Sequence, residues 1–438
     1  MRELNLVRAG RLEWRDRPEP VLESGTEALV RPFVASRCDG DTLPIHRPVS
    51  RAMQAGLKAG LIDPVVGSIL GSVPFKGPFG IGHECVAQVT EAGADVAGIN
   101  VGDLVVVPWA ISCGSCEECR LGLTAKCSTM RIESAGRTLA AFGFGPSCGP
   151  WGGVVADSLR VPFADHMLVR VPDGVDPLRV AAAGDNLSDA WRAVVPALQE
   201  RPGGSVLVIG GGAQSIGLYA AGLAVRHGAA TVDYLDDSAA RLEIAQGFGA
   251  TPHQVAKNRR RSAARPTGYD VVVEASSQTS GLRDAIRALK PGGICTATGY
   301  YLATGTKVPI MDMYATSATL RVGISHVRPI LPALLDAALD GQVATTGFRV
   351  DQVFLTATLI YILLPALMVV LSLLLRPRVN RIINIVLSLL YMVSVIVSCI
   401  GEEWAYYIVG SVIEAVLLLG IAVTAWKWPG PSAAAANP

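Results

Sequence analysis

The 438-residue sequence lacks two features that would narrow its function at once. It has no excess of charge of one sign, because 38 basic residues stand against 37 acidic ones. Nucleic-acid partners would require a basic excess, so none is expected. It also lacks an apolar run near the N-terminus, where MRELNLVRAGRLEWRD is charged, so a secretory signal is not predicted and a reducing cytoplasm is expected. We therefore expect small molecules as partners, and a homo-oligomer is left open.

The nine cysteines are unevenly distributed along the chain. Four of them lie within CGSCEECRLGLTAKC, with the spacing C-x2-C-x2-C-x7-C: Cys113, Cys116, Cys119 and Cys127. Such crowding without a secretory signal favours a metal over disulfides. Zinc held by four thiolates has no open position and is structural. A reactive thiol cluster and an iron–sulfur site are the alternatives.

Two styles of sequence divide the first 350 residues. Residues 1–172 contain short apolar runs broken by Gly, Pro and Asp, which predicts an all-β unit. Residues 173–320 alternate strand-like and helix-like segments, which predicts an α/β unit with a parallel sheet and crossover helices. A helix is expected over 329–341 and a strand in QVATTGFRV. The segment 47–80, with a short helix in RAMQAGLKAGL, is either a lid or a surface insertion.

A glycine-rich turn in SVLVIGGGAQSIGLYAAGLAV predicts a nucleotide site, because backbone amides and a helix N-terminus there would hold a pyrophosphate. The turn is formed either by Gly210, Gly212 and Gly217, or by Gly212 and Gly217 with Gln214 replacing the middle glycine. Ile216 belongs to the same turn. Asp236, at the end of the next strand, would accept hydrogen bonds from the ribose hydroxyls and repel a 2′-phosphate. NAD is therefore preferred to NADP, although Asp236 is also placed to cap the next helix.

Three positions are candidates for a catalytic zinc, which needs three protein ligands and an open position for substrate. They are Cys38 in SRCDGD, His83 followed by Glu84 in GIGHE, and Asp185 in AAAGDNLSDAW. A single cysteine is more often a small buried apolar residue, so none of the three is decisive alone. The occurrence of all three in one chain supports the hypothesis of a catalytic zinc site.

GHE, the four-cysteine segment, VGDLVVV and the glycine-rich turn occur in the order found in zinc-containing medium-chain alcohol dehydrogenases, which the chain resembles over about residues 1–350. The resemblance implies a GroES-like β-barrel catalytic domain over 1–172, a Rossmann domain over 173–320 and a truncated return to the catalytic domain over 321–352. It implies two zinc ions per chain, one catalytic and one structural, and hydride transfer between NAD and an alcohol, aldehyde or ketone. It also implies that Cys38 and His83 bind the catalytic zinc, with Glu84 beside it and Asp185 as third ligand where cysteine is common.

One element of the family pattern is missing. Relatives relay the alcohol proton through Ser or Thr two residues after the first zinc cysteine, and this chain has Gly40 there. Thr42 and His46 are nearby replacements, with His46 as an ordinary surface residue the alternative. A protein that binds zinc and nucleotide without catalysis is therefore the competing hypothesis, and a chimeric product without a function as a whole is the third.

After residue 352 the character of the sequence changes. Apolar stretches over 353–375, 382–400 and 405–426 are each long enough to cross a bilayer, so three transmembrane helices are predicted over 353–428 and a disordered tail over 429–438. Through VNRIINIVLSLLY, Glu414 in the third stretch and the ending AWKWP, the tail resembles a family of small uncharacterised multi-helix membrane proteins. We expect a membrane protein in contact with lipid through 353–426, whose dehydrogenase domain is cytoplasmic. Arg376, Arg378 and Arg381, in a predicted loop RPRVNR, conflict with this topology, since the positive-inside rule puts that loop in the cytoplasm and the enzyme outside.

Overall fold

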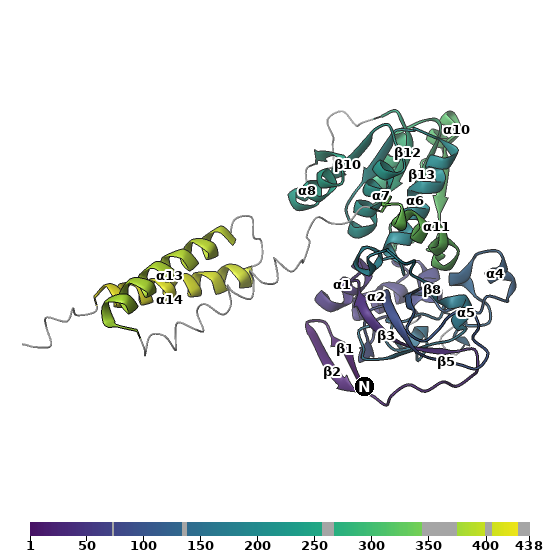
Figure 1. Cartoon of the computed structure of the whole chain (residues 1–438). Helices are drawn as coiled ribbons and strands as arrows, with labels where there is room; N and C mark the ends of the chain where they lie inside the picture. The colour runs from purple at the N-terminus through teal and green to yellow at the C-terminus, as the bar shows by residue number, and fades with distance from the viewer. Residues whose placement is uncertain (72–73, 134–137, 256–266, 344–374, 399–404, 428–438) are drawn as a thin grey trace, which may run out of the picture. The chain divides into compact units, whose positions relative to one another are not determined.

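The computed structural model describes residues 1–71, 74–133, 138–255, 267–343, 375–398 and 405–427. The chain divides into two units, Met1–Gly347 and Phe348–Pro438. The first unit contains two antiparallel sheets, formed by the N-terminal half, and a six-stranded sheet (Figure 1). The α/β fold class predicted from the sequence is therefore confirmed for this unit.

The N-terminal half is built on a five-stranded antiparallel sheet with the order β7-β3-β5-β6-β8. Its strands are β3 (Ala28–Ala35), β5 (Cys85–Ala92), β6 (Leu104–Val107), β7 (Leu159–Val161) and β8 (Val169–Arg170). A smaller sheet holds β1 (Arg2–Arg8), β2 (Arg11–Asp16) and β4 (Phe79–Gly80). In the central strand β5 the first three side chains are fully buried. Because β5 begins directly after His83 and Glu84, the core of the sheet fixes where these two residues lie.

Short helices connect these strands. They are α1 (Asp39–His46), α2 (Val49–Lys58), α3 (Gly67–Leu70), α4 (Glu117–Arg120) and α5 (Ala164–Met167), with 3-10 turns η1 (Pro64–Val66), η2 (Thr124–Lys126), η4 (Pro146–Cys148) and η5 (Pro177–Val180). The helix α1 directly follows β3 through Cys38, whose side chain caps it by accepting a hydrogen bond from the Gly40 amide.

The six-stranded sheet has the order β11-β10-β9-β12-β13-β14, and every neighbouring pair is parallel. Its strands are β9 (Val206–Ile209), β10 (Val232–Asp236), β11 (Thr251–Gln254), β12 (Tyr269–Glu274), β13 (Leu289–Ala297) and β14 (Thr319–Val322). All four residues of β9 are buried, as expected for a parallel strand covered on both faces. The strand order reverses between β9 and β12, and such sheets bind ligands at the carboxyl ends of the strands at that point.

Six helices accompany this sheet: α6 (Asn186–Glu200), α7 (Gln214–Arg226), α8 (Ala239–Gly247), α9 (Thr279–Arg287), α10 (Ile310–Thr316) and α11 (Val327–Leu339). The helix α11, expected over 329–341, contacts α6 and also β8 and η2 of the N-terminal half. The strand predicted in QVATTGFRV lies outside the described residues.

In the described part of the second unit, two helices pack against each other, α13 (Pro377–Ser398) and α14 (Ala405–Trp426). They correspond to the second and third apolar stretches, whereas 353–375 and the tail after 428 lie outside the described residues. The sequence analysis was wrong to treat RPRVNR as a loop, because α13 begins at Pro377 and includes Arg378 and Arg381. Proline at a first helical position sacrifices no hydrogen bond and favours the start of a helix there.

Candidate active site

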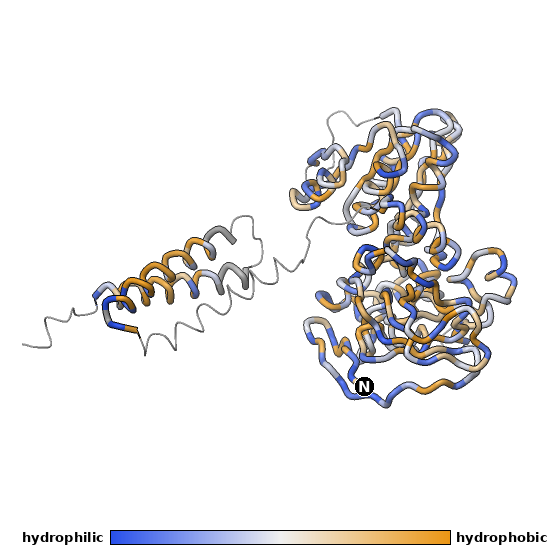
Figure 2. Tube along the Cα trace, viewed as in Figure 1, coloured by the Kyte–Doolittle hydropathy of each residue, from blue (hydrophilic) through white to orange (hydrophobic). Residues whose placement is uncertain are grey.

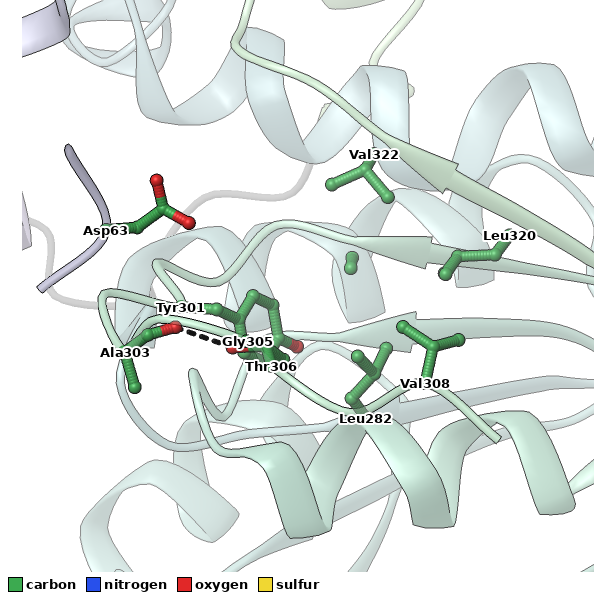
Figure 3. Close-up of a pocket in the computed structure, with 10 residues that line it drawn as sticks. Asp63, Leu282, Tyr301, Ala303, Gly305, Thr306, Val308, Leu320 and Val322 are labelled. Carbon is green, nitrogen blue, oxygen red and sulfur yellow. Dashed lines mark hydrogen bonds between the residues drawn. The ribbon is translucent and has the colours of Figure 1, made fainter. Parts of the chain in front are cut away.

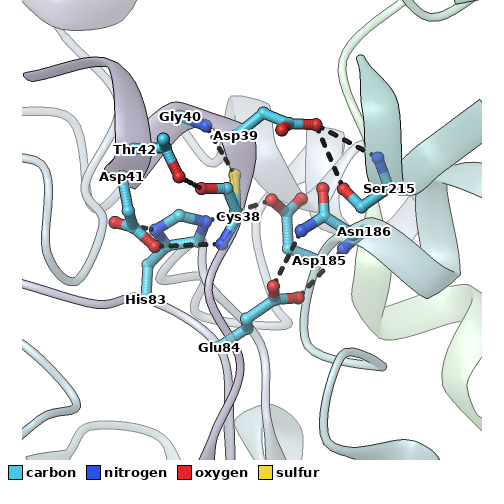
Figure 4. A network of polar contacts seen from close by, with 10 residues as sticks. All are labelled: Cys38, Asp39, Gly40, Asp41, Thr42, His83, Glu84, Asp185, Asn186 and Ser215. Atoms are coloured by element: carbon cyan, nitrogen blue, oxygen red, sulfur yellow. Dashed lines mark hydrogen bonds and ion pairs between the residues drawn. The ribbon is translucent and has the colours of Figure 1, made fainter. Parts of the chain in front are cut away.

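Three candidate zinc ligands from three separate segments meet in the first unit. The ligand atoms of Cys38, His83 and Asp185 all lie within 4.8 Å of one another. Cys38 precedes α1, His83 precedes β5, and Asp185 is the residue before α6 (Figure 4). The His83 Nε2 lies 3.1 Å from an oxygen of Asp185. The structure therefore brings together the three residues that the sequence analysis selected.

Asp41 is a further member of this site, and the sequence analysis missed it. Its carboxylate lies 3.1 Å from Nδ1 of His83 and accepts a hydrogen bond from the Cys38 amide at 3.3 Å. A carboxylate on the second ring nitrogen holds a histidine in one orientation and increases its strength as a metal ligand. The signal in the sequence was an aspartate three residues after Cys38, at the position that completes a capping box on α1.

Glu84 is fully buried beside the three ligands but points to a different partner. Its carboxylate accepts hydrogen bonds from the backbone amide of Asn186 at 3.0 Å and from its side-chain amide at 2.8 Å. Burial and the charge of Asp185 raise the pKa of Glu84 to about 8. Because Asn186 follows Asp185 directly, Glu84 anchors the start of α6 and with it the Asp185 carboxylate.

The donor set of the site fits zinc. Burial raises the pKa of the Cys38 thiol to about 11, with His83 opposing the rise. Burial lowers the pKa of His83, but Asp41 and Cys38 outweigh it and the pKa is raised well above its usual range. A divalent ion at the centre of these donors would stabilise the thiolate of Cys38 and the carboxylate of Asp185, and so offset the cost of burying their charges. One sulfur, one nitrogen and one carboxylate oxygen leave a fourth tetrahedral position open, as catalytic zinc requires.

The proposed relay residues occupy different surroundings. Thr42 is half-buried on α1 and donates a hydrogen bond from Oγ1 to the Cys38 carbonyl at 3.1 Å. His46 is exposed at the end of α1. The Gly40 amide donates to Sγ of Cys38 at 3.0 Å. Thr42 thus lies beside a candidate zinc ligand. A role of Thr42 or of His46 in proton transfer stays a prediction.

The ligand atoms of the four clustered cysteines also lie within 4.8 Å of one another. Burial raises the pKa of Cys113, but its hydrogen bonds with Ser115 and Thr129 outweigh burial and lower the pKa to about 5. The segment carries little regular structure, and the small core around it consists of the cysteines themselves with Met130 and Phe163. Four thiolates at this distance fit a closed, tetrahedral zinc site that fastens the loop.

The glycine-rich turn lies between β9 and α7, at the reversal of strand order. An added Cβ would come within 2.3 Å of the Asp236 carboxylate at Gly210 and within 2.7 Å of the Ser277 hydroxyl at Gly212. Gly217 lies within the first turn of α7 against Ala275, where a Cβ would meet that residue's own Cβ at 3.2 Å. These contacts explain why glycine occupies the three positions, because a side chain would clash with Asp236, Ser277 or Ala275. A glycine turn followed by a helix N-terminus is the arrangement that binds the pyrophosphate of a dinucleotide. Ile216 is half-buried on α7, packed against the main core.

Asp236 ends β10 as predicted, but an arginine that the sequence analysis missed lies beside it. Arg241, in the first turn of α8, donates to the Asp236 carboxylate at 2.5 and 2.8 Å and contacts Asp237 at 3.1 Å. It also donates to the side chain of Gln214 at 3.1 Å. Tyr234 and the Ser238 amide donate to Asp236 as well, at 3.1 and 2.9 Å. Asp236 and Asp237 together still outweigh the single positive charge of Arg241.

A separate cavity of about 390 Å³ lies between α9, β14 and the loop after β13 (Figure 3). Asp63, from the segment 47–80, is among its lining residues, and its amide donates to the Leu302 carbonyl at 2.8 Å. The Thr304 hydroxyl donates to the Gly60 carbonyl at 2.8 Å. The segment 47–80 therefore joins the N-terminal half to the six-stranded sheet, and its action as a lid stays a prediction.

Comparisons with known proteins agree with this geometry. The alcohol dehydrogenase GroES-like domain matches residues 25–173, and the zinc-binding dehydrogenase family matches residues 215–339. A probable zinc-binding alcohol dehydrogenase of Mycobacterium tuberculosis is 34% identical over 275 residues, which cover 63% of this chain and 68% of that protein. A probable D-xylulose reductase A of Aspergillus fumigatus is 31% identical over 227 residues, which cover 50% of this chain and 58% of that protein.

Solved structures give the same result for the first unit. The alcohol dehydrogenase TADH from Thermus sp. ATN1 has a TM-score of 0.65 and 30% sequence identity, covering 78% of this chain and 90% of that one. Both family matches end before residue 340, so they do not bear on the second unit. With its GroES-like and Rossmann-type parts and its zinc-ligand geometry, the chain belongs to the zinc-containing medium-chain alcohol dehydrogenase family of oxidoreductases.

Proposed function

We propose that this protein is a zinc-dependent alcohol dehydrogenase that transfers a hydride between an alcohol and NAD, with an aldehyde or ketone as the other substrate. The convergence of Cys38, His83 and Asp185 within 4.8 Å carries this proposal. Cys38, His83 and Asp185 would hold the zinc, which would supply polarisation of the substrate oxygen and a lower pKa of the alcohol, and the hydride would pass to NAD. One zinc ion would occupy this site and a second the four-cysteine site.

The residues of the chain would position the reactants and exclude water. Asp41 fixes the ring of His83, and Glu84 fixes the start of α6. The ring of Phe144 lies 4.6 Å from that of His83 and 5.6 Å from the ring of Trp109. Trp109 is buried, so this side of the site is apolar. An apolar wall favours the hydrocarbon part of an alcohol and strengthens electrostatic interactions at the metal position.

NAD is the proposed cofactor because the carboxylates of Asp236 and Asp237 outweigh the charge of Arg241 at the end of β10. A 2′-phosphate would meet a net negative charge there. Asp236 is buried and accepts from Tyr234, the Ser238 amide and Arg241, so a ribose hydroxyl would have to displace one of these donors to bind it. Arg241 holds the Asp236 carboxylate in place by donating two hydrogen bonds to it. The preference for NAD therefore depends on Asp236 more than on the glycine turn.

Turnover of an alcohol panel with NAD and with NADP tests this proposal on the full chain. We expect a higher kcat/KM with NAD, and we expect Asp236→Ser to lower the ratio of NAD to NADP activity by about tenfold or more. Asp173→Asn, a change at an exposed position, is the matched control. A wild-type preference for NADP would contradict the cofactor assignment. Bound zinc without turnover on any alcohol would instead select the competing hypothesis of a binding protein.

We further propose that the second unit attaches the enzyme to a membrane. The helix α13 contains an 18-residue window, Arg378–Val395, with a mean hydropathy of 1.4, and the apolar helix segment Ser411–Trp426 is slightly shorter. The described parts of α13 and α14 are mostly hydrophobic (Figure 2). In α13 the apolar side chains lie mainly on the exposed face, the inverse of a helix in a water-soluble bundle. Its buried residues include two polar ones, Asn380 and Ser388, beside Tyr391 and Val395. Its exposed face is apolar, at 45–61% exposure: Ile382, Val386, Leu389, Leu390 and Val393.

An apolar face without a covering layer suits lipid, and polar or small side chains suit the contact between helices in a membrane. Arg381 donates to the Trp426 carbonyl at 2.7 Å, so the start of α13 and the end of α14 form one basic end with Lys427. We assign this basic end to the cytoplasmic side. The dehydrogenase, which needs NAD and reduced thiols, shares that side on the condition that the stretch 353–375 does not cross the bilayer.

Extraction of membranes with alkaline carbonate checks this attachment. We expect the full chain to stay in the pellet and to be released by detergent, since burial of two apolar helices exceeds what a peripheral contact supplies. The double substitution Val386→Lys and Leu390→Lys, on the exposed face of α13, should weaken retention. Release of the unaltered chain by carbonate alone would contradict membrane insertion.

A further inference from the structure

The N-terminus of α7 already holds an internal anion. The amide of Ser215 donates to an oxygen of Asp39 at 3.2 Å, and the Ser215 hydroxyl donates to the same oxygen at 3.2 Å (Figure 4). Asp39 is the first residue of α1 and is separated from Ser215 by 176 positions in the chain. The first amides of a helix have no partner within it and attract negative charge.

These amides are the ones that the proposed dinucleotide needs. The helix α7 has 13 residues, and its internal hydrogen bonds begin where the Gly217 amide donates to the Ala213 carbonyl. The amides of Gly212 and Ala213 are used by carbonyls of Ser276 and Ala275. Ser215 therefore supplies one of the few amides left at the end of the glycine turn, and Asp39 accepts its hydrogen bond.

We propose that Asp39 competes with the pyrophosphate of the dinucleotide for the N-terminus of α7 and so sets cofactor affinity. The inference rests on the proposed function, because it concerns the same nucleotide site. A carboxylate and a pyrophosphate cannot share one amide, and two like charges a few ångströms apart repel each other strongly in a partly buried site. The side chain of Asp39 must therefore move away from Ser215 before the cofactor binds. The free energy needed for this movement weakens cofactor binding.

A purely structural role for Asp39 makes the opposite prediction. If its contact with Ser215 only joins α1 to α7, removal of the carboxylate would leave dinucleotide binding equal or weaker. Competition predicts tighter binding, and only for ligands that contain a pyrophosphate. The Kd for adenosine, which lacks phosphate, should not depend on the side chain at position 39.

The test is calorimetric titration of the full chain with ADP-ribose and, separately, with adenosine. We expect Asp39→Asn and Asp39→Ser to lower the Kd for ADP-ribose by about tenfold or more, with no change for adenosine. Zinc content is measured in each variant, because Cys38 is adjacent to residue 39. Asp173→Asn, with a side chain 93% exposed, controls for a change in net charge.

The outcomes separate the two claims. Tighter ADP-ribose binding in the Asp39 variants, or binding that appears only in them, supports the competition. Equal or weaker binding in both variants with zinc retained overturns the inference while leaving the nucleotide site intact. Absence of ADP-ribose binding in the wild type and in every variant overturns both the inference and the proposed dehydrogenase function.

Discussion

Replacement of Asp185 by alanine is expected to remove one of two zinc ions per chain and to lower kcat/KM by about three orders of magnitude or more. The Asp185 carboxylate lies 3.1 Å from Nε2 of His83. Without it only Cys38 and His83 remain as ligands, and catalytic zinc sites hold the metal with three. Metal analysis by mass spectrometry and steady-state kinetics on the full chain measure the two effects.

A second substitution distinguishes loss of a ligand from general damage to the site. Asp185→Cys supplies a thiolate at the same position, and cysteine is common there in the family that the sequence resembles. We expect this variant to keep both zinc ions and a substantial part of the turnover. Retention of both zinc ions and full turnover by Asp185→Ala would show that Asp185 is not a ligand.

Replacement of Cys127 by alanine is expected to remove the other zinc ion and to lower the Tm by about 10 °C or more, since structural zinc contributes directly to folding. Cys127 is 4% exposed. The surrounding segment has only the four residues of α4 and the three of η2 in regular structure. With the metal gone, very little apolar core remains to hold the segment in place.

The effect should extend beyond the loop. The Ala125 amide, two residues before Cys127, donates to Nδ1 of His326 at 3.2 Å, and His326 precedes α11. Disorder of the loop would therefore loosen the contact of α11 with the N-terminal half. Thermal unfolding followed by circular dichroism, with metal analysis on the same samples, measures the loss.

Cys295→Ala is the matched control for this second experiment. Cys295 is fully buried on β13 and belongs to neither metal cluster. Its replacement removes a buried sulfur and should cost only about 1 kcal/mol through the small cavity that it leaves. Equal losses of Tm in the two variants would mean that the Cys127 effect comes from packing and that no metal fastens the segment.

The two metal sites differ in how far the sequence alone predicts them. The four cysteines occupy fifteen consecutive residues, so short loops bring their sulfurs together whatever the rest of the fold does. The alternation of apolar segments likewise predicts a parallel sheet with a glycine turn after its first strand, because burial on both faces requires continuous apolar strands. The hypothesis that Cys38, His83 and Asp185 bind a catalytic zinc depended on a family resemblance as well as on residue type.

The tertiary structure decided the contacts between distant segments. His83 and Asp185 are separated by 102 positions, and Asp39 and Ser215 by 176. Local patterns carry no information on such pairs, since the pairing of β strands and the crossover helices determine which segment ends meet. The contact of Asp41 with Nδ1 of His83 was likewise found only in the folded chain.

Arg241 shows the same limit at shorter range. Five positions separate it from Asp236, yet the turn into α8 is needed to bring its guanidinium back onto that carboxylate. The sequence thus determined the residue types, the local turns and the closed metal site. The fold decided which carboxylate orients His83 and which one occupies the α7 N-terminus, because side chains far apart in the chain meet only when the core aligns their strands and helices.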